Sequence, residues 1–292
     1  MRKAIAMIAG SIVSVQLGSS IAKSLFPDAG PIGMVWLRVT AAALILTVVA
    51  RPRLRGHTQR DWFVLGQYAV ALIAMNVTFY QAIARIPVGL AVTIEFLGPL
   101  AVAIVKSRGA KDLIWVGLAA AGVVLLGGSP GSLTWAGVGF ALAAAACWGA
   151  YILIAPHVGA RWSGAQPVAL ANIAGSVVLI APALILHGAV FTRPWVWIAG
   201  LALGLLSSVL PYGLELAALR TLDQRVFSIM MSVEPAVAAL WALIILGEKL
   251  SPTDLVAMGC VIAASVGITW TTSRQRYRAR QVKTTDAEGA EP

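Results

Sequence analysis

The chain has 292 residues, of which 59% are hydrophobic and only 12% are charged. A soluble domain typically carries about 25% charged residues, so the composition excludes an ordinary soluble protein and indicates an integral membrane protein. The net charge of +10 is not evidence for nucleic-acid binding, because the basic residues fall in short loops and a C-terminal tail. We therefore expect the lipid bilayer as a partner and no nucleic acid.

Apolar runs of about 20 residues, the length of a membrane-spanning helix, recur along the whole chain. The runs are too long and alternate too weakly to be barrel strands. The first run follows Met1-Arg2-Lys3 and resembles a signal peptide, but its length and the later runs favour an uncleaved helix. The sequence predicts an all-α protein with ten transmembrane helices, at 4–22, 31–50, 62–84, 88–107, 112–128, 134–155, 165–187, 195–219, 226–246 and 252–272.

The distribution of lysine and arginine predicts how these helices are oriented. With the N-terminus inside, 17 of the 22 basic residues lie on the inner side and four on the outer side. Cytoplasmic loops are enriched in lysine and arginine, so we expect both termini in the cytoplasm. The tail at 273–292 is first basic and then acidic, and we expect it to be disordered.

Two of the predicted helices combine a carboxylate with a proline. Glu95 is followed four residues later by Pro99, and Glu234 is followed directly by Pro235. Proline removes a backbone N–H and clashes with the preceding turn, so we expect a helix kink at each proline. An ionisable group in hydrocarbon is costly and usually faces a partner or a cavity.

The two prolines also suggest an internal duplication. Each lies in the fourth of five spans, so the chain divides into a first five-helix repeat at 1–128 and a second at 134–272. Because five is odd, the second repeat enters the membrane with the opposite orientation. Inverted repeats of this kind are common in secondary transporters, with the substrate site at their interface near the membrane centre.

Charged and polar residues inside the spans are the candidates for that site. Arg38 and Glu95 each lie about eight residues from the outer end of a span, roughly 12 Å deep at the helical rise, so they can meet. They form either a static ion pair or a site that grips the two ends of a zwitterion. Neutral hydrogen-bonding partners at similar depth are Asn76, Tyr80 and Gln81.

Three further candidates lie in the inner halves of their spans. Glu215 is near the cytoplasmic end, where it either faces the site or pairs with Arg220 or Arg225. Glu234 is deeper, and Tyr212 follows Pro211 in the same span as Glu215. A carboxylate that meets water from each side in turn can carry a proton, so protons are expected partners.

Other features limit the remaining functions. The spans at 112–128 and 134–155 are rich in glycine and alanine, which permits close packing either within one protomer or across a homodimer interface. No loop carries a nucleophile with a base, a phosphate-binding glycine loop or a cluster of metal ligands. We therefore expect no enzymatic activity, no metal site and no cofactor. A subunit without transport activity is a further alternative, which a sealed membrane centre would favour.

The arrangement of spans and motifs resembles the EamA branch of the drug/metabolite transporter superfamily, and most of all its threonine/homoserine exporter subfamily. The resemblance covers about residues 4–272 and departs from the family pattern at Arg108-Gly109, where a Gly-Glu pair usually closes the fourth span. It is carried by Glu95-Phe96-Leu97-Gly98-Pro99-Leu100, Glu215-Leu216-Ala217-Ala218-Leu219, Met231-Ser232-Val233-Glu234-Pro235-Ala236 and Leu246-Gly247-Glu248.

This resemblance implies a multi-pass protein of the bacterial inner membrane that exports small zwitterionic amino acids, threonine or homoserine among them, by proton antiport. An exporter or facilitator of other small metabolites or drugs on the same fold is the alternative, which a cavity lined by several aromatic side chains would favour.

Overall fold

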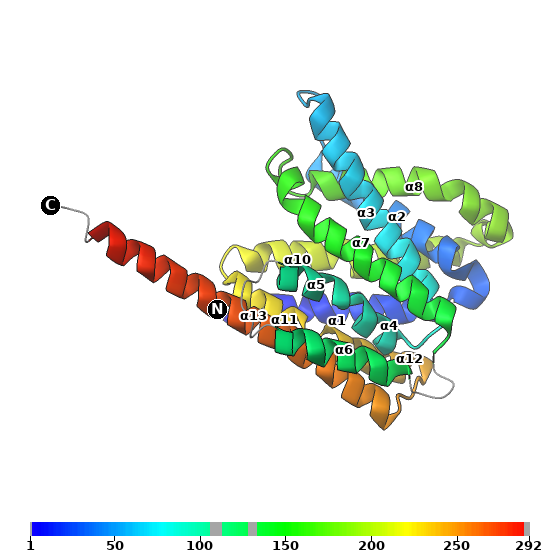
Figure 1. Ribbon diagram of the computed structural model, residues 1–292. Helices are drawn as coiled ribbons and strands as arrows, with labels where there is room; N and C mark the ends of the chain where they lie inside the picture. Colours follow the sequence, from blue (N-terminus) through cyan, green and yellow to red (C-terminus); the bar gives the residue numbers. More distant parts are fainter. Residues whose placement is uncertain (1, 106–112, 128–132, 289–292) are drawn as a thin grey trace.

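A computed structural model describes residues 2–105, 113–127 and 133–288, and all regular structure in these ranges is helical (Figure 1). Each of the first five predicted spans corresponds to a helix or a pair of helices. The helices of this half are α1 (Arg2–Ser24), α2 (Phe26–Ala50), α3 (Gln59–Ile83), α4 (Val88–Glu95), α5 (Leu97–Val105) and α6 (Leu113–Gly127).

The second half contains further interrupted segments, among them one 3₁₀ helix (η2) and one π-helix (η3). Its elements are α7 (Trp135–Gly159), α8 (Gln166–His187), η2 (Gly188–Thr192), α9 (Pro194–Gly204), η3 (Leu205–Val209), α10 (Leu210–Leu219), α11 (Gln224–Met231), α12 (Glu234–Leu246) and α13 (Pro252–Glu288).

The predicted membrane-spanning helices are present in the described ranges. Among the described residues, nine helical segments are long and apolar enough to cross a membrane, and Leu113–Leu125 is a shorter apolar helix. Together they coincide with the ten predicted spans. The expectation of an all-helical protein built from apolar spans is confirmed.

The outer surface of the bundle is apolar, as contact with lipid requires. Large hydrophobic side chains are exposed along many of the helices, with examples at Val48, Val70, Val124, Ile185 and Ile198. Water-soluble monomers rarely expose continuous apolar surface on this scale. The surface therefore supports the membrane assignment independently of helix length.

The short helix α4 lies at the centre of the protein, and all eight of its residues are buried. Small residues permit this central position. A Cβ on Gly89 would collide with Ala239 of α12, and a Cβ on Gly98, just beyond α4, would collide with the backbone of α7 at Ala145. The glycine in the Glu95–Leu100 motif is thus required where α5 and α7 approach each other closely.

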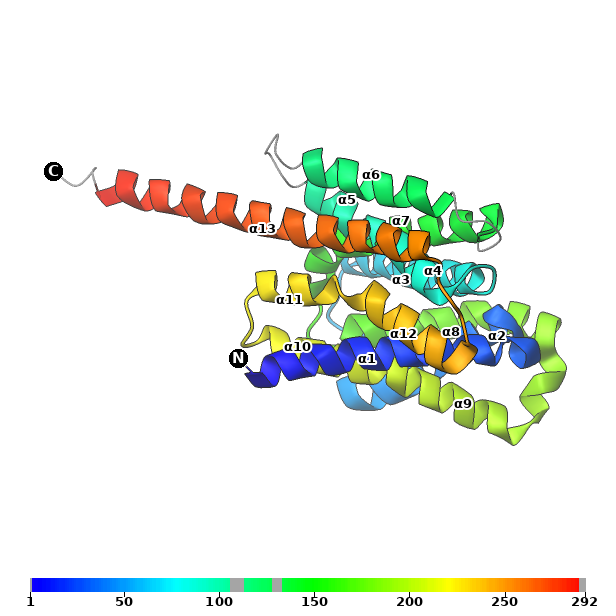
Figure 2. The same ribbon diagram turned by 90° about the horizontal axis from the view of Figure 1, so that it is seen from below.

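The two ends of the chain lie at the same end of the bundle (Figures 1 and 2). There α13 extends well beyond the other helices. We expect a disordered tail from residue 273, whereas α13 continues to Glu288. Arginine, lysine, glutamine and alanine, which are good helix formers, make up nine of the 16 residues at 273–288.

Candidate functional site

A cavity of about 230 Å³ lies where the interrupted helices meet. Its polar lining comes from nine elements of both halves of the chain. Six of the eight residues that the sequence suggests for binding are in this lining, and Tyr80 and Gln81 are not. The polar lining residues are Gln16, Ser19, Arg38, Asn76, Glu95, Tyr151, Asn172, Ser207, Ser208, Tyr212, Glu215 and Glu234.

Arg38 is held in the cavity by the π-helical segment η3, and Pro211 explains why. Proline has no N–H, so Pro211 cannot bond the carbonyl of Ser207 four residues earlier. Arg38 Nη2 donates to this carbonyl at 2.7 Å, and Arg38 Nε donates to Ser208 Oγ at 3.2 Å. The guanidinium is thereby fixed, and a guanidinium has five N–H donors, so donors remain for a ligand.

Arg38 and Glu95 face the same cavity without forming an ion pair. Salt bridges within 4 Å in the described residues are Lys23–Glu248 and Arg161–Asp61, and neither involves Arg38 or Glu95. The charge of Arg38 nevertheless acts on Glu95. The static ion pair, one of the two arrangements that the sequence leaves open, is therefore not formed between Arg38 and Glu95.

Glu234 and Glu215 complete a group of three carboxylates. Glu234 is only 6% exposed, and the charges of both Glu215 and Glu95 act on it. Glu215 accepts a hydrogen bond from Ser11 Oγ of α1 at 2.6 Å. In the described residues it makes no ion pair with Arg220, and the side chain of Arg225 lies outside the described residues.

Two asparagines of the cavity lining are oriented by hydrogen bonds within their own helices. Asn76 Nδ2 donates to the Leu72 carbonyl at 2.8 Å, and Asn172 Nδ2 donates to the Val168 carbonyl at 2.7 Å. Each bond runs to the preceding turn of the same helix and fixes the orientation of the amide. The Oδ1 atoms accept no hydrogen bond from any described residue, so they remain available as acceptors.

Tyr80 and Gln81 have other roles in the structure. Tyr80 is fully buried; its hydroxyl lies 3.5 Å from Arg38 Nη1 and its ring packs beneath the guanidinium. Gln81 lies outside the cavity and accepts a hydrogen bond from Arg85 Nη1 at 2.6 Å. The reason is helical geometry, because at about 100° per residue position 81 points well away from Asn76.

The helix interruptions lie next to the prolines. The fourth span divides between Glu95 and Leu97, one turn before Pro99, and the ninth divides between Met231 and Glu234, with Pro235 in the first turn of α12. Each division places a glutamate at the end of a half-helix, where it lines the cavity.

Sequence reasoning missed several cavity residues that a simple signal would have found. Gln16 and Asn172 are polar amides within otherwise apolar runs, and such residues in membrane spans are functional candidates by default. The aromatic members of the lining have no such signal, because tryptophan, tyrosine and phenylalanine are also ordinary packing residues. Those that were missed are Phe79, Trp148 and Tyr151, whereas Tyr212 is among the predicted candidates.

An ion pair at the opposite end of the bundle from the two termini was also missed. Lys23 Nζ lies 2.5 Å from Glu248 Oε1 and donates to the Ile86 carbonyl at 2.8 Å. Glu248 Oε2 accepts from the Val88 N–H, the first residue of α4, at 2.8 Å. We call this group of Lys23, Ile86, Val88 and Glu248 the latch. It ties α1 and the end of α12 to the N-terminus of α4.

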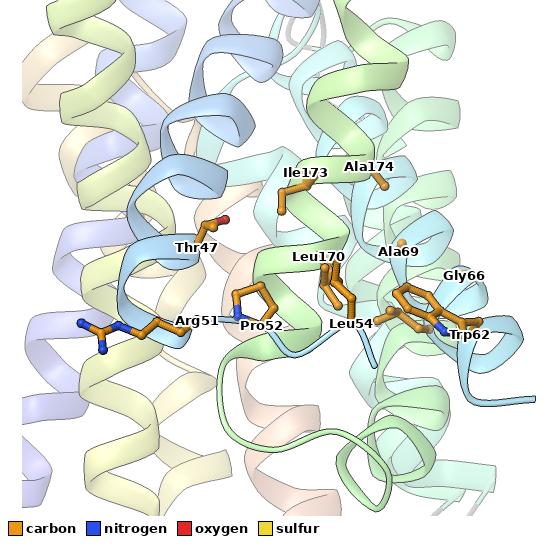
Figure 3. A pocket seen from close by; sticks show the side chains of 11 residues that line it. Thr47, Arg51, Pro52, Leu54, Trp62, Gly66, Ala69, Leu170, Ile173 and Ala174 are labelled. Atoms are coloured by element: carbon orange, nitrogen blue, oxygen red, sulfur yellow. The ribbon is translucent and has the colours of Figure 1, made fainter. Parts of the chain in front are cut away.

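A larger hollow of about 720 Å³ lies between α2, α3 and α8 (Figure 3). Its lining is mostly apolar, and its large hydrophobic side chains are Leu54, Trp62, Leu65, Leu170 and Ile173. Arg51 is the ionisable group of this lining, and its guanidinium points away from the hollow in Figure 3. The hollow offers no set of polar groups for orienting a ligand, so the smaller cavity is the better candidate site.

Comparison with known proteins assigns the chain to a family. Residues 135–270 match the model of the EamA-like transporter family. "Threonine/homoserine exporter RhtA" of Escherichia coli (strain K12) is 39% identical over 271 residues, which cover 91% of this chain and 90% of the relative. The protein of the same name from Salmonella typhimurium (strain SL1344) is 38% identical over 265 residues, 90% of each chain.

The chain belongs to the EamA-like transporter family. Within the family it groups with these RhtA exporters, as its motifs indicate. A solved crystal structure covers 92% of this chain and 98% of its own with a TM-score of 0.64, at 18% identity. That similarity supports the fold of this EamA transporter and carries no information about its substrate.

Proposed function

We propose that this EamA transporter exports small zwitterionic amino acids, such as threonine and homoserine, across the bacterial inner membrane by proton antiport. The observation that carries the proposal is the central cavity, in which Arg38 faces three carboxylates without an ion pair to any of them. Separated charges of opposite sign match the two ends of an amino acid. The similarity to the RhtA exporters supports the choice of substrate.

The groups in the cavity suggest how each end of the substrate is bound. The substrate carboxylate accepts hydrogen bonds from the free N–H donors of Arg38, a pairing for which the planar guanidinium is well suited. The ammonium donates to Glu95 and to the amide oxygens of Asn76 and Asn172. Tyr80 beneath the guanidinium limits the motion of Arg38.

Glu234 is our candidate for the proton-carrying group. Carboxylates that share a site do not all ionise, because like charges repel. Glu95 faces Arg38, whereas Glu234 faces the two other carboxylates. We therefore expect the shared proton to reside mainly on Glu234 and to leave when the site is exposed to the opposite side of the membrane.

The direction of the cavity supports uptake of substrate from the cytoplasm. Its lining includes Val168 in the first turn of α8 and Glu215 in the second half of α10. These ends of the two helices lie toward the end of the bundle where both termini are found. The latch closes the opposite end. With 17 of 22 basic residues on the terminal side, we assign that side to the cytoplasm.

We also infer that residues 1–128 and 134–272 are inverted repeats. In support, the fourth span of each half is interrupted at a glutamate that lines the cavity, and the family model matches the second half alone. Such repeats provide two arrangements around one site, as alternating access requires.

Export of other metabolites is the second candidate, and four aromatic side chains in the lining favour it. The volume of the cavity argues against large drugs, because about 230 Å³ is below the roughly 300–1,000 Å³ of sites for drug-sized ligands. An amino acid is therefore the better match.

Purified protein in liposomes tests the proposal. Labelled threonine is placed inside, the outside is acidified, and release is measured for wild type, Glu95→Gln, Glu234→Gln and the control Gln81→Leu. We expect gradient-driven release from wild type and the control, and a loss of about tenfold or more in each glutamate variant, the size expected for losing a charged contact.

Threonine exchange without a pH gradient separates the two glutamates. Because exchange needs substrate binding but no net proton movement, Glu234→Gln should retain it and Glu95→Gln should lose it. No threonine or homoserine release from wild type would contradict the amino-acid assignment, and release by Glu234→Gln at the wild-type rate would contradict the role of Glu234.

A further inference from the structure

Two residues of the cavity lining each carry a buried polar atom that has no hydrogen-bond partner among the described residues. These atoms are the side-chain amide oxygen of Gln16 on α1 and the hydroxyl of Ser207 on η3. Gln16 is 3% exposed and Ser207 is 5% exposed, and both line the cavity. Buried polar groups are nearly always hydrogen-bonded, and each exception requires an explanation.

The two groups belong to elements that pack directly against each other. Ser14 Oγ of α1 donates to the Leu206 carbonyl of η3 at 2.6 Å. The Ser207 hydroxyl lies against Gly18, where any Cβ would collide with it. Gly18 thus allows α1 to approach η3, and Gln16, two residues earlier on α1, lines the same cavity as Ser207.

This pair lies beside the anchored guanidinium. Arg38 Nη2 donates to the carbonyl of Ser207, and Arg38 Nε donates to the hydroxyl of the next residue, Ser208. The Ser207 side chain is therefore close to the point where the proposed substrate carboxylate binds. A ligand group that contacts Gln16 and Ser207 is therefore part of the same small molecule whose carboxylate Arg38 binds.

We propose that Gln16 and Ser207 form a subsite for the side-chain hydroxyl of the substrate and select hydroxy amino acids over apolar ones of equal size. A hydroxyl can donate one hydrogen bond and accept another. A substrate hydroxyl can therefore donate to the Gln16 amide oxygen and accept from the Ser207 hydroxyl. A methyl group in the same place would leave both unpaired. The inference rests on the proposed function, and it adds the residues that determine specificity.

Threonine and valine provide the comparison, because they have nearly the same shape and differ by a hydroxyl against a methyl. Liposomes are loaded with unlabelled threonine, labelled threonine is added outside, and unlabelled threonine or valine competes for exchange. A site built to hydrogen-bond a hydroxyl discriminates strongly against its absence. For wild type we expect valine to compete about 10- to 100-fold less well than threonine.

Variants of the two residues should remove this discrimination. In Gln16→Met and Ser207→Ala the threonine-to-valine ratio should fall to within a few-fold of one, while competition by valine stays the same or improves. Retained competition by valine shows that the variants are folded. Ser20→Ala is the matched control, because the Ser20 hydroxyl is also buried and without a partner but lies outside the cavity; its ratio should equal that of wild type.

The outcomes separate this inference from the proposed function. If wild type exchanges threonine but the threonine-to-valine ratio is unchanged in Gln16→Met and Ser207→Ala, the hydroxyl subsite is overturned. Amino-acid export is then left intact. Equal competition by threonine and valine in wild type also overturns it. Wild type that exchanges neither overturns the proposed function and this inference with it.

Discussion

At the scale of single residues, Pro211 and Arg38 form one unit although 173 positions separate them in the sequence. The proline frees a backbone carbonyl inside the membrane, where no water is available to satisfy it. Arg38 Nη2 donates a hydrogen bond to this carbonyl at 2.7 Å, which fixes the guanidinium in the cavity. The same bond therefore stabilises the π-helical segment and positions the group proposed to bind substrate.

A double-mutant cycle tests this unit. Arg38→Met leaves the Ser207 carbonyl without its partner and should lower the free energy of unfolding by about 1–3 kcal/mol. In a Pro211→Ala background the new N–H at position 211 can bond the carbonyl, so Arg38→Met should cost about 1 kcal/mol less. Thermal or denaturant unfolding of the detergent-purified proteins measures both costs. Equal costs in the two backgrounds would show that Pro211 and Arg38 are independent.

At the scale of elements, α4 connects the latch to the site. It begins at Val88, whose N–H donates to Glu248, and it ends at Glu95 in the cavity. Eight residues of helix span about 12 Å, and all eight are buried. A shift of α4 would therefore move both the latch and Glu95, so this half-helix connects the latch to the candidate site.

The contribution of the latch can be separated into its two bonds. Glu248→Gln keeps an acceptor for the Val88 N–H but loses the ion pair with Lys23. It should lower the free energy of unfolding by about 1 kcal/mol or less, since the pair is partly exposed. Glu248→Leu loses both and should cost about 1–3 kcal/mol more. Unfolding midpoints measure both effects, with the exposed neighbour Lys249→Leu as control. Equal midpoints for the two Glu248 variants would rule out the bond to α4.

The positions of the helices could be predicted from the sequence, because the hydrocarbon thickness sets the length of an apolar run. The candidates Arg38, Glu95 and Glu234 could also be predicted, since the cost of a buried charge makes each of them conspicuous. The π-helical segment could not, because it depends on a distant arginine as well as on a local proline. Gln81 was predicted to line the site from its depth along the span alone, and its depth does not show the direction in which its side chain points. The latch joins residues 160 positions apart, which no local pattern reveals.

At the scale of the whole molecule, the cavity and the latch lie at different depths along the bundle. The lining includes Leu72 in the middle of α3 and Val168 in the first turn of α8, near the end with both termini. The latch lies at the opposite end, beyond Ile83 of α3. A single closed end and a single accessible side are what one state of an alternating-access transporter requires. Together with the asymmetry of basic residues, this arrangement predicts an inward-facing state.

Chemical labelling of two positions on α3 tests that state and the orientation together. In a background with Cys147→Ala and Cys260→Ala, Leu72→Cys should react with a membrane-impermeant maleimide in inside-out vesicles and should be protected in right-side-out spheroplasts, because its route to water passes through the cytoplasmic side. Ala84→Cys, exposed just after the end of α3, should react with the opposite sidedness. Labelling of both positions from the periplasm alone would contradict the inward-facing state. Exchange of the two patterns would instead reverse the assigned orientation, because the sidedness of Ala84→Cys depends only on which end of α3 faces the cytoplasm.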